Sequence, residues 1–159
     1  MEFEKLIKEM TSAIVVCDGA RAAACFTDEG FYDDIFYGVF RKAVIPDLVE
    51  NHFHRDSENL VWEICETAST TQVGFARYIF SYDSKLSEAK GKRAIFEGVS
   101  VCRLYSGKIV SYHEVANVHT GLSMMDFQPV RLSKIAQRQA KSLRSKVSNI
   151  HIKNNTVKH

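Results

Sequence analysis

The spacing of hydrophobic residues changes near residue 60. Before that point hydrophobic side chains recur at helical spacing, and Phe3, Ile7, Met10 and Ile14 predict a helix over residues 2–16. Asp18 is a good N-cap residue, so a second, short helix is expected after it. The first part of the chain is therefore expected to be mainly helical.

Residues 27–30 are expected to form a turn, and the aromatic and branched residues of 31–38 predict a short strand. A third helix is predicted from about residue 41 to residue 53. Pro46 fits this helix only in its first turn, where a missing N–H is tolerated.

Beyond residue 60 the chain contains four long runs of β-branched and aromatic residues, at 60–68, 71–83, 92–105 and 108–119. The last two runs flank Ser106 and Gly107, a two-residue connection typical of a hairpin in which Gly107 adopts a positive φ. Strands of about a dozen residues are longer than the usual five or six, and such strands normally curl. A curled sheet has a concave side that must be filled.

These elements predict an α+β fold with a curved antiparallel sheet of four long strands plus a short one. The sheet is expected to wrap around the N-terminal helices and to form a cone with an apolar cavity. Pro129 predicts the start of a C-terminal helix. We expect one domain over residues 1–146, with a core at about 1–120, a basic helix at about 129–146, and a disordered tail at 147–159.

The charges are distributed unevenly along the chain. The net charge is +2, but all 19 acidic residues lie at or before Asp126, whereas the segment 127–159 holds eight of the 21 Lys and Arg residues. The basic helix is expected to dock on the acidic body or on a partner subunit, with a polyanion as the alternative. Nucleic acid is not expected, because the basic helix lacks the aromatic residues that stack on bases.

Other features exclude several classes of protein. The sequence has no apolar run long enough to span a membrane and no secretory leader, so a cytoplasmic location is expected. The four cysteines are far apart and are expected to be free thiols. Because His52 and His54 cannot share one helix face, no metal is expected, and no nucleotide-binding motif or other cofactor signature occurs.

Three short segments resemble the nuclear transport factor 2-like superfamily, particularly its SnoaL-like and ketosteroid-isomerase-like branches. They are Phe26-Thr-Asp-Glu-Gly-Phe-Tyr-Asp-Asp34 followed by Tyr37-Gly38, then Phe96-Glu-Gly98, and Gly107-Lys-Ile-Val-Ser-Tyr-His-Glu114. The resemblance covers about residues 1–120. It implies a cone-shaped domain, but this superfamily includes isomerases, polyketide cyclases, dehydratases and epoxide hydrolases beside binding proteins, so the fold does not choose the function.

The resemblance implies two acidic candidates for catalysis. An acid on the last strand takes part in proton transfer in related cyclases, and Glu114 matches that position. A carboxylate inside an apolar cone would have a raised pKa, which suits acid/base chemistry. An acid shortly before a glycine lies at the cavity mouth of ketosteroid-isomerase-like proteins, and Asp34 matches with Gly38 as the marker. The alternatives are a salt-bridged Glu114 and a pair of turn acids, Asp33 and Asp34.

Arg77 is the third catalytic candidate, because a charge in an otherwise apolar strand needs a partner such as Glu114, Glu97 or Asp34. The resembling epoxide hydrolases carry Arg-x-Asp here, whereas this chain has Ile79. A structural ion pair is the alternative. The candidate substrate-binding residues are aromatic: Tyr32, Tyr37, Tyr112, Trp62 and Phe96.

The sequence thus predicts a cofactor-free enzyme that performs acid/base chemistry on a small hydrophobic, carbonyl-bearing molecule, as an isomerase, polyketide cyclase or dehydratase would. The alternative is a non-catalytic ligand-binding or dimerisation module in which the same residues form ion pairs. A homodimer formed through the sheet is expected in either case, since the outer face of the sheet must also be covered.

Overall fold

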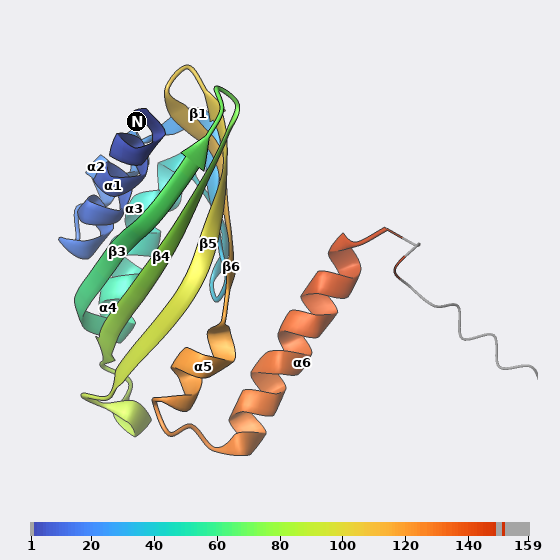
Figure 1. Ribbon diagram of the computed structural model, residues 1–159. Helices are drawn as coiled ribbons and strands as arrows, with labels where there is room; N and C mark the ends of the chain where they lie inside the picture. The colour runs from blue at the N-terminus through green and yellow to red at the C-terminus, as the bar shows by residue number, and fades with distance from the viewer. Residues whose placement is uncertain (1, 149–150, 152–159) are drawn as a thin grey trace, which may run out of the picture. The chain divides into compact units, whose positions relative to one another are not determined.

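The computed structural model describes residues 2–148 and residue 151, and the chain forms two compact units, residues 1–126 and 127–159, which are described separately (Figure 1). In the first unit, helices lie against one side of a curved sheet. Among the described residues, no helix is long and apolar enough to cross a membrane.

The first two helices form as predicted. Helix α1 (Glu2–Val15) buries one side, with Phe3, Ile7 and Met10 in the core. Helix α2 (Gly19–Ala24) begins after Asp18, whose carboxylate accepts a hydrogen bond of 3.0 Å from the backbone N–H of Arg21. This bond satisfies one of the free donors at the helix start.

The turn predicted at residues 27–30 is wrong, because these residues belong to strand β1 (Phe26–Asp34). Strand β1 pairs with the last strand through a register shift between Phe26 and Phe31, which takes up the extra residues. Gly30 lies in this bulge, where a Cβ atom would approach the carbonyl oxygen of Ile109 to 2.8 Å. The glycine that indicated a turn therefore permits a close approach of two backbones.

The helix predicted over residues 41–53 is confirmed only in part, because the segment is helical from Lys42 onward but is divided into several short helical pieces. Strand β2 (Gly38–Arg41) comes first, followed by a 3₁₀ turn η1 (Lys42–Val44), helix α3 (Ile45–Leu48), a π-helical turn η2 (Val49–Phe53) and helix α4 (His54–Asp56). Pro46 lies in the first turn of α3, as predicted. Because proline cannot sit inside a helix, the helix starts at Ile45 rather than at Arg41.

The sheet contains six strands in the order β2-β1-β6-β5-β4-β3. The four long strands are β3 (Ser57–Ser69), β4 (Val73–Ser84), β5 (Arg93–Tyr105) and β6 (Lys108–Ala116). They form the predicted antiparallel meander. The prediction missed one short strand and the one parallel pairing of the sheet, which joins β1 to β6.

The predicted hairpin between β5 and β6 is confirmed. Ser106 and Gly107 both have positive φ, 48° and 73°, as in the type I′ turns that suit the twist of paired strands. After β6 the first unit ends with helix α5 (Val118–Ser123), and a 3₁₀ turn η3 (Ser87–Ala89) lies in the loop before β5.

The second unit contains helix α6 (Pro129–Lys146), which matches the predicted basic helix and has Pro129 in its first turn. The guanidinium of Arg131 lies 3.9 Å from the centre of the Phe127 ring. Apart from residues 147, 148 and 151, the tail predicted to be disordered lies outside the described residues.

Helix α5 contacts the sheet at Gly121, and this contact positions one wall of the site described below. A Cβ atom at Gly121 would lie 2.2 Å from the Phe96 ring, far inside van der Waals contact. A Gly→Ala change in a helix normally stabilises by up to about 1 kcal/mol. Here Gly121→Ala should instead destabilise by about 1–3 kcal/mol, because Phe96 must move.

Denaturant unfolding measures this difference, with the neighbouring exposed Thr120→Ala as the control that should change stability by less than about 0.5 kcal/mol. A Gly121→Ala protein as stable as the parent would contradict the described packing of Phe96.

Candidate active site

One cavity of the first unit brings together aromatic rings and two carboxyl groups. Its volume is about 40 Å³, and it is partly open to solvent. Ile35, Ala116 and Val118 supply aliphatic surface, and Asp34 and Glu114 supply the carboxyl groups. The remaining lining residues are aromatic: Tyr32, Phe36, Phe53, Trp62, Tyr78, Phe80 and Phe96.

Glu114 projects into this cavity from β6, as strand alternation predicted. Its Oε2 atom accepts hydrogen bonds from the hydroxyl groups of Tyr78, at 2.6 Å, and Tyr112, at 3.2 Å. The backbone N–H of Ile35 is a further donor to the carboxylate. His113 is exposed on the outer face, so the adjacent acid and histidine do not form a catalytic pair.

Asp34 ends β1 and is the inward-facing member of the Asp33–Asp34 pair. Its side chain is only 5% exposed, and its Oδ1 atom accepts hydrogen bonds from the backbone N–H groups of Phe36, at 2.8 Å, and Tyr37, at 2.9 Å. These two bonds fix the carboxyl group at the start of the turn between β1 and β2. Asp33 faces the other way and lies 3.2 Å from the Nδ1 atom of His113.

The parallel pairing of β1 with β6 places the two acids in one site. Tyr32 is opposite Tyr112 in this register, and Asp34 and Glu114 lie two residues farther along their strands. Burial is the main cause that raises the pKa of both groups, to about 6 for Asp34 and about 7 for Glu114. The charge of Asp34 raises the pKa of Glu114 further, whereas the Tyr78 and Tyr112 hydroxyl groups lower it.

Carboxyl groups that interact in this way share their protons, and the two pKa values belong to the pair. Near neutral pH the pair can hold one proton, with one member ionised and the other protonated. An ionised carboxylate is a general base and a protonated carboxyl is a general acid. The site can therefore move a proton between two positions of a bound molecule.

Two polar groups at the cavity have no hydrogen-bond partner among the described residues: the hydroxyl of Tyr32 and the indole Nε1 of Trp62. Tyr32 is 1% exposed and stacks on Tyr112 with ring centres 4.2 Å apart, but the hydroxyl of Tyr112 donates to Glu114 instead. Unpaired buried polar groups are costly and rare. Because neither atom is accessible from the cavity as it stands, a ligand or water would satisfy them only after the rings shift.

The structure does not bring Arg77 to this site. Arg77 lies on the outer face of β4, where its Nε atom is 2.8 Å from Glu66 and its Nη1 atom is 2.9 Å from Glu97. Of the three partners considered from the sequence, only Glu97 is the observed one. The structural ion pair is thus the correct interpretation of Arg77.

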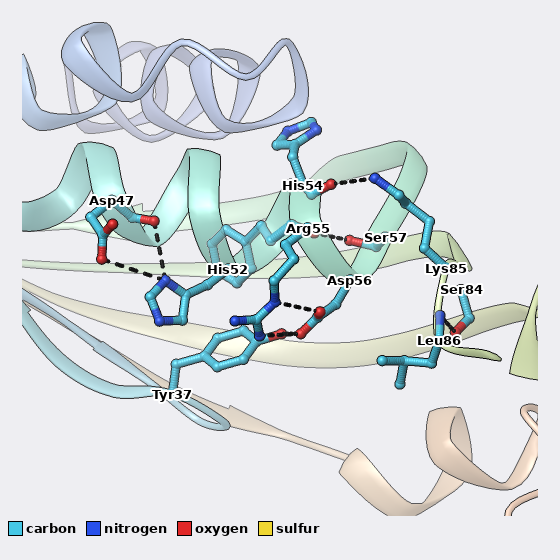
Figure 2. A network of polar contacts seen from close by, with 11 residues as sticks. Tyr37, Asp47, His52, His54, Arg55, Asp56, Ser57, Ser84, Lys85 and Leu86 are labelled. Carbon is cyan, nitrogen blue, oxygen red and sulfur yellow. Dashed lines mark hydrogen bonds and ion pairs between the residues drawn. The ribbon is translucent and has the colours of Figure 1, made fainter. Parts of the chain in front are cut away.

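Tyr37 is also absent from the cavity lining, so its predicted place among the substrate contacts is wrong. Its hydroxyl donates to the Oδ2 atom of Asp56 at 2.9 Å, and Arg55 binds the same carboxylate at 2.6 and 2.7 Å (Figure 2). Tyr112 lies behind Tyr32 and contacts Glu114 rather than the cavity itself. Tyr32, Trp62 and Phe96 line the cavity, and their role as substrate contacts stays a prediction.

Sequence reasoning missed Tyr78, the closest hydroxyl donor to Glu114. Strand alternation places Tyr78 on the face opposite Arg77, so the same parity argument that separated His113 from Glu114 would have found it. Phe36 and Phe53 were also missed, because their approach to the cavity depends on the β1–β2 turn and on the π-helical turn η2.

Within the described ranges, no group of three or more His, Cys, Asp or Glu side chains could hold a metal ion. The four cysteines are free; Cys25 and Cys102 are buried, and Cys17 and Cys65 are accessible to different degrees.

A comparison with models of known families found no match, and neither did a comparison with curated proteins. Solved structures do match. A protein with a ketosteroid-isomerase-like fold from Catenulispora acidiphila, solved in complex with trimethylamine, is 13% identical, with a TM-score of 0.67 over 78% of this chain and 97% of that one.

A candidate SnoaL-like polyketide cyclase from Shewanella putrefaciens is 11% identical, with a TM-score of 0.65 over 79% of this chain and 86% of that one. An LEH-like epoxide hydrolase from M. tuberculosis is 12% identical, with a TM-score of 0.63 over 92% and 97%. At these identities the likeness shows the fold alone. The chain has the nuclear transport factor 2-like cone fold, of the type found in SnoaL-like and ketosteroid-isomerase-like proteins.

The raised pKa values predict how stability changes with pH. Each carboxyl group binds its proton more tightly in the folded state than in the unfolded state, so its contribution to stability is present at low pH and is lost as pH rises through the folded pKa. From about pH 5 to pH 8 the pair should reduce the free energy of unfolding by about 2–4 kcal/mol.

Urea unfolding across this range measures the loss. The double variant Asp34→Asn/Glu114→Gln should show a smaller loss, while Glu63→Gln, an exposed glutamate next to Trp62 in the chain, should behave like the parent. If the double variant and the parent lost stability equally, the two carboxyl groups would not be buried as described.

Proposed function

We propose that the protein is a cofactor-free enzyme that moves a proton on a small carbonyl compound, as isomerases, cyclases and dehydratases of this fold type do. The observation that carries the proposal is the pair of enclosed carboxyl groups, Asp34 and Glu114, in one aromatic cavity. The chemistry needs a base and an acid of matched strength near neutral pH, and the shared pKa range of the pair supports this.

The ionised member of the pair removes a proton from the carbon next to the carbonyl group. The C–H bond breaks and its electron pair moves into the enolate oxygen. The protonated member then gives its proton to another carbon of the conjugated enolate, and the carbonyl bond re-forms. Proton exchange within the pair restores the starting state, so the reaction needs no co-reactant.

Two donors could stabilise the enolate oxygen. The Tyr32 hydroxyl and the Trp62 indole N–H are the two unpaired polar groups at the cavity among the described residues. Donors that are already fixed in a site from which water is excluded stabilise a developing oxyanion far better than they would in water. Tyr78 has a different role, because its 2.6 Å hydrogen bond holds Glu114 and favours its ionised form.

The outer face of the sheet supports a homodimer, and the four free thiols fit the proposed cytoplasmic location. Several large apolar side chains are exposed on its strands: Val61, Phe75, Ile95, Val99 and Val115. Exposed apolar patches of this kind mark association surfaces. The Arg77–Glu66–Glu97 ion pairs lie on the same face and would form part of the interface.

Substitution of either acid should strongly slow turnover with little change in fold. A cyclic ketone in deuterated water reports proton removal directly, because each removal exchanges a hydrogen for deuterium and can be followed by NMR. Glu114→Gln and Asp34→Asn should each lower the exchange rate by about 10²–10⁴-fold. The matched control Glu63→Gln should exchange at the parent rate.

Exchange at the parent rate in both acid variants would remove the carboxyl pair from the mechanism. Should the parent bind ketones without exchanging them, the non-catalytic binding alternative would replace the proposal.

Tyr78→Phe tests whether Tyr78 positions and tunes Glu114. Loss of the hydroxyl removes a hydrogen bond to a charged group, worth about 1.5–3 kcal/mol, so the pKa of Glu114 should rise by about 1–2 units. The pH profile of ketone exchange should shift to higher pH accordingly. A lower rate with an unchanged pH profile would assign Tyr78 a purely structural role.

A further inference from the structure

The cavity combines acidic groups with aromatic walls, and no basic side chain lines it among the described residues. When the pair is ionised, its negative charge faces a mainly apolar space; His52 lowers the pKa of Asp34 from outside the cavity lining, but no cation lines the cavity among the described residues. A buried charge that lacks a partner is costly. The hydrogen bonds from Tyr78 and Tyr112 reduce this cost but bring no positive charge.

The aromatic walls form one connected surface. Trp62 contacts Tyr78 and Phe80, with ring centres 5.5 and 4.7 Å apart, and Phe80 contacts Phe96 at 6.5 Å. Phe36 completes the series against Phe96 at 6.0 Å and a steep angle of 70°. Aromatic rings attract cations through the negative potential of their faces, and rings that surround a site recognise alkylated ammonium groups.

The unpaired buried groups supply an independent observation. The oxygen of Tyr32 can accept a hydrogen bond from an N–H group, whereas the Trp62 indole can only donate and needs an acceptor oxygen. A molecule with a protonated amine and a nearby oxygen would neutralise the carboxyl pair, and it would satisfy both groups once the two rings shift to expose them. A neutral hydrocarbon would satisfy neither, and an anion would be repelled.

We infer that the cavity binds a small protonated, alkylated amine that carries an oxygen acceptor. The inference rests on the proposed function and names its substrate class: an amino-carbonyl compound whose ammonium group lies between the carboxyl pair and the aromatic walls. The ammonium charge would also help to stabilise the enolate formed at the neighbouring carbonyl group.

Two probes of the same shape isolate the contribution of the positive charge to binding. Protonated N,N-dimethylethanolamine and 3-methylbutan-1-ol have the same shape and the same hydroxyl group, and they differ in an N–H⁺ in place of a C–H. Trp62 is the one tryptophan of the sequence and lines the cavity, so its fluorescence reports occupancy directly. The amine should bind about 10-fold or more tightly than the alcohol.

The preference for the amine over the alcohol should depend on the two carboxyl groups, Asp34 and Glu114. Glu114→Gln and Asp34→Asn should each reduce the preference severalfold, while Glu63→Gln keeps it. A circular dichroism melt shows whether each variant is folded, and thermal stabilisation by the amine gives a second readout in variants with altered fluorescence.

Equal or tighter binding of the alcohol would overturn the inference, and so would a lack of binding of either probe up to its solubility limit. Because the probes are not turned over, this result is separate from the ketone-exchange test. Loss of exchange in the acid variants together with a preference for the alcohol would retain the proposed enzyme and reject the cationic substrate.

Discussion

The parallel pairing of β1 with β6 is the constraint on which the site depends. The other strand pairs of the sheet are antiparallel. The parallel register places Tyr32 beside Tyr112 and brings Asp34 to the same cavity as Glu114. Two carboxyl groups so placed cannot both ionise easily, since desolvation raises the pKa of each and the charge of Asp34 raises the pKa of Glu114 further. The proton that they share is a consequence of strand order and register.

The rest of the fold supports this pairing. The bulge in β1 absorbs the extra residues between Phe26 and Phe31, and Gly30 allows the close approach that the bulge needs. On the other side of the cavity, the long strands β3 to β5 curl and carry the aromatic residues inward. Ion pairs such as Arg77 with Glu97 remain on the outer face, where water reduces their contribution to stability.

Much of the fold could be predicted from local pattern. The spacing of Phe3, Ile7 and Met10, the Asp18 cap and the Ser106–Gly107 turn each depend on residues near in sequence, and each is confirmed. Residues 27–30 were misassigned because their conformation depends on β6, about 80 residues away, and a glycine in a bulge looks the same in sequence as a glycine in a turn.

In the site, too, the features that depend on local pattern could be predicted, and those that depend on distant packing could not. Parity along one strand placed Glu114 inside and His113 outside, and the resemblance pointed to Asp34. Arg77 was misassigned because an unusual charge attracted attention, although its own strand alternation favours Tyr78 for the cavity. The unpaired Tyr32 and Trp62 groups could not be predicted, because whether a polar atom finds a partner depends on the complete packing around it.

Carboxyl titration by ¹³C NMR in the parent and in Asp34→Asn measures the central claim, that the two acids share one proton in one cavity. The account predicts that the Glu114 carboxyl titrates well above its ordinary value in the parent. Its pKa should fall, but not return to that value, once the Asp34 charge is removed, because burial remains the larger cause. A Glu114 carboxyl that titrates near its ordinary value in both proteins would contradict the account.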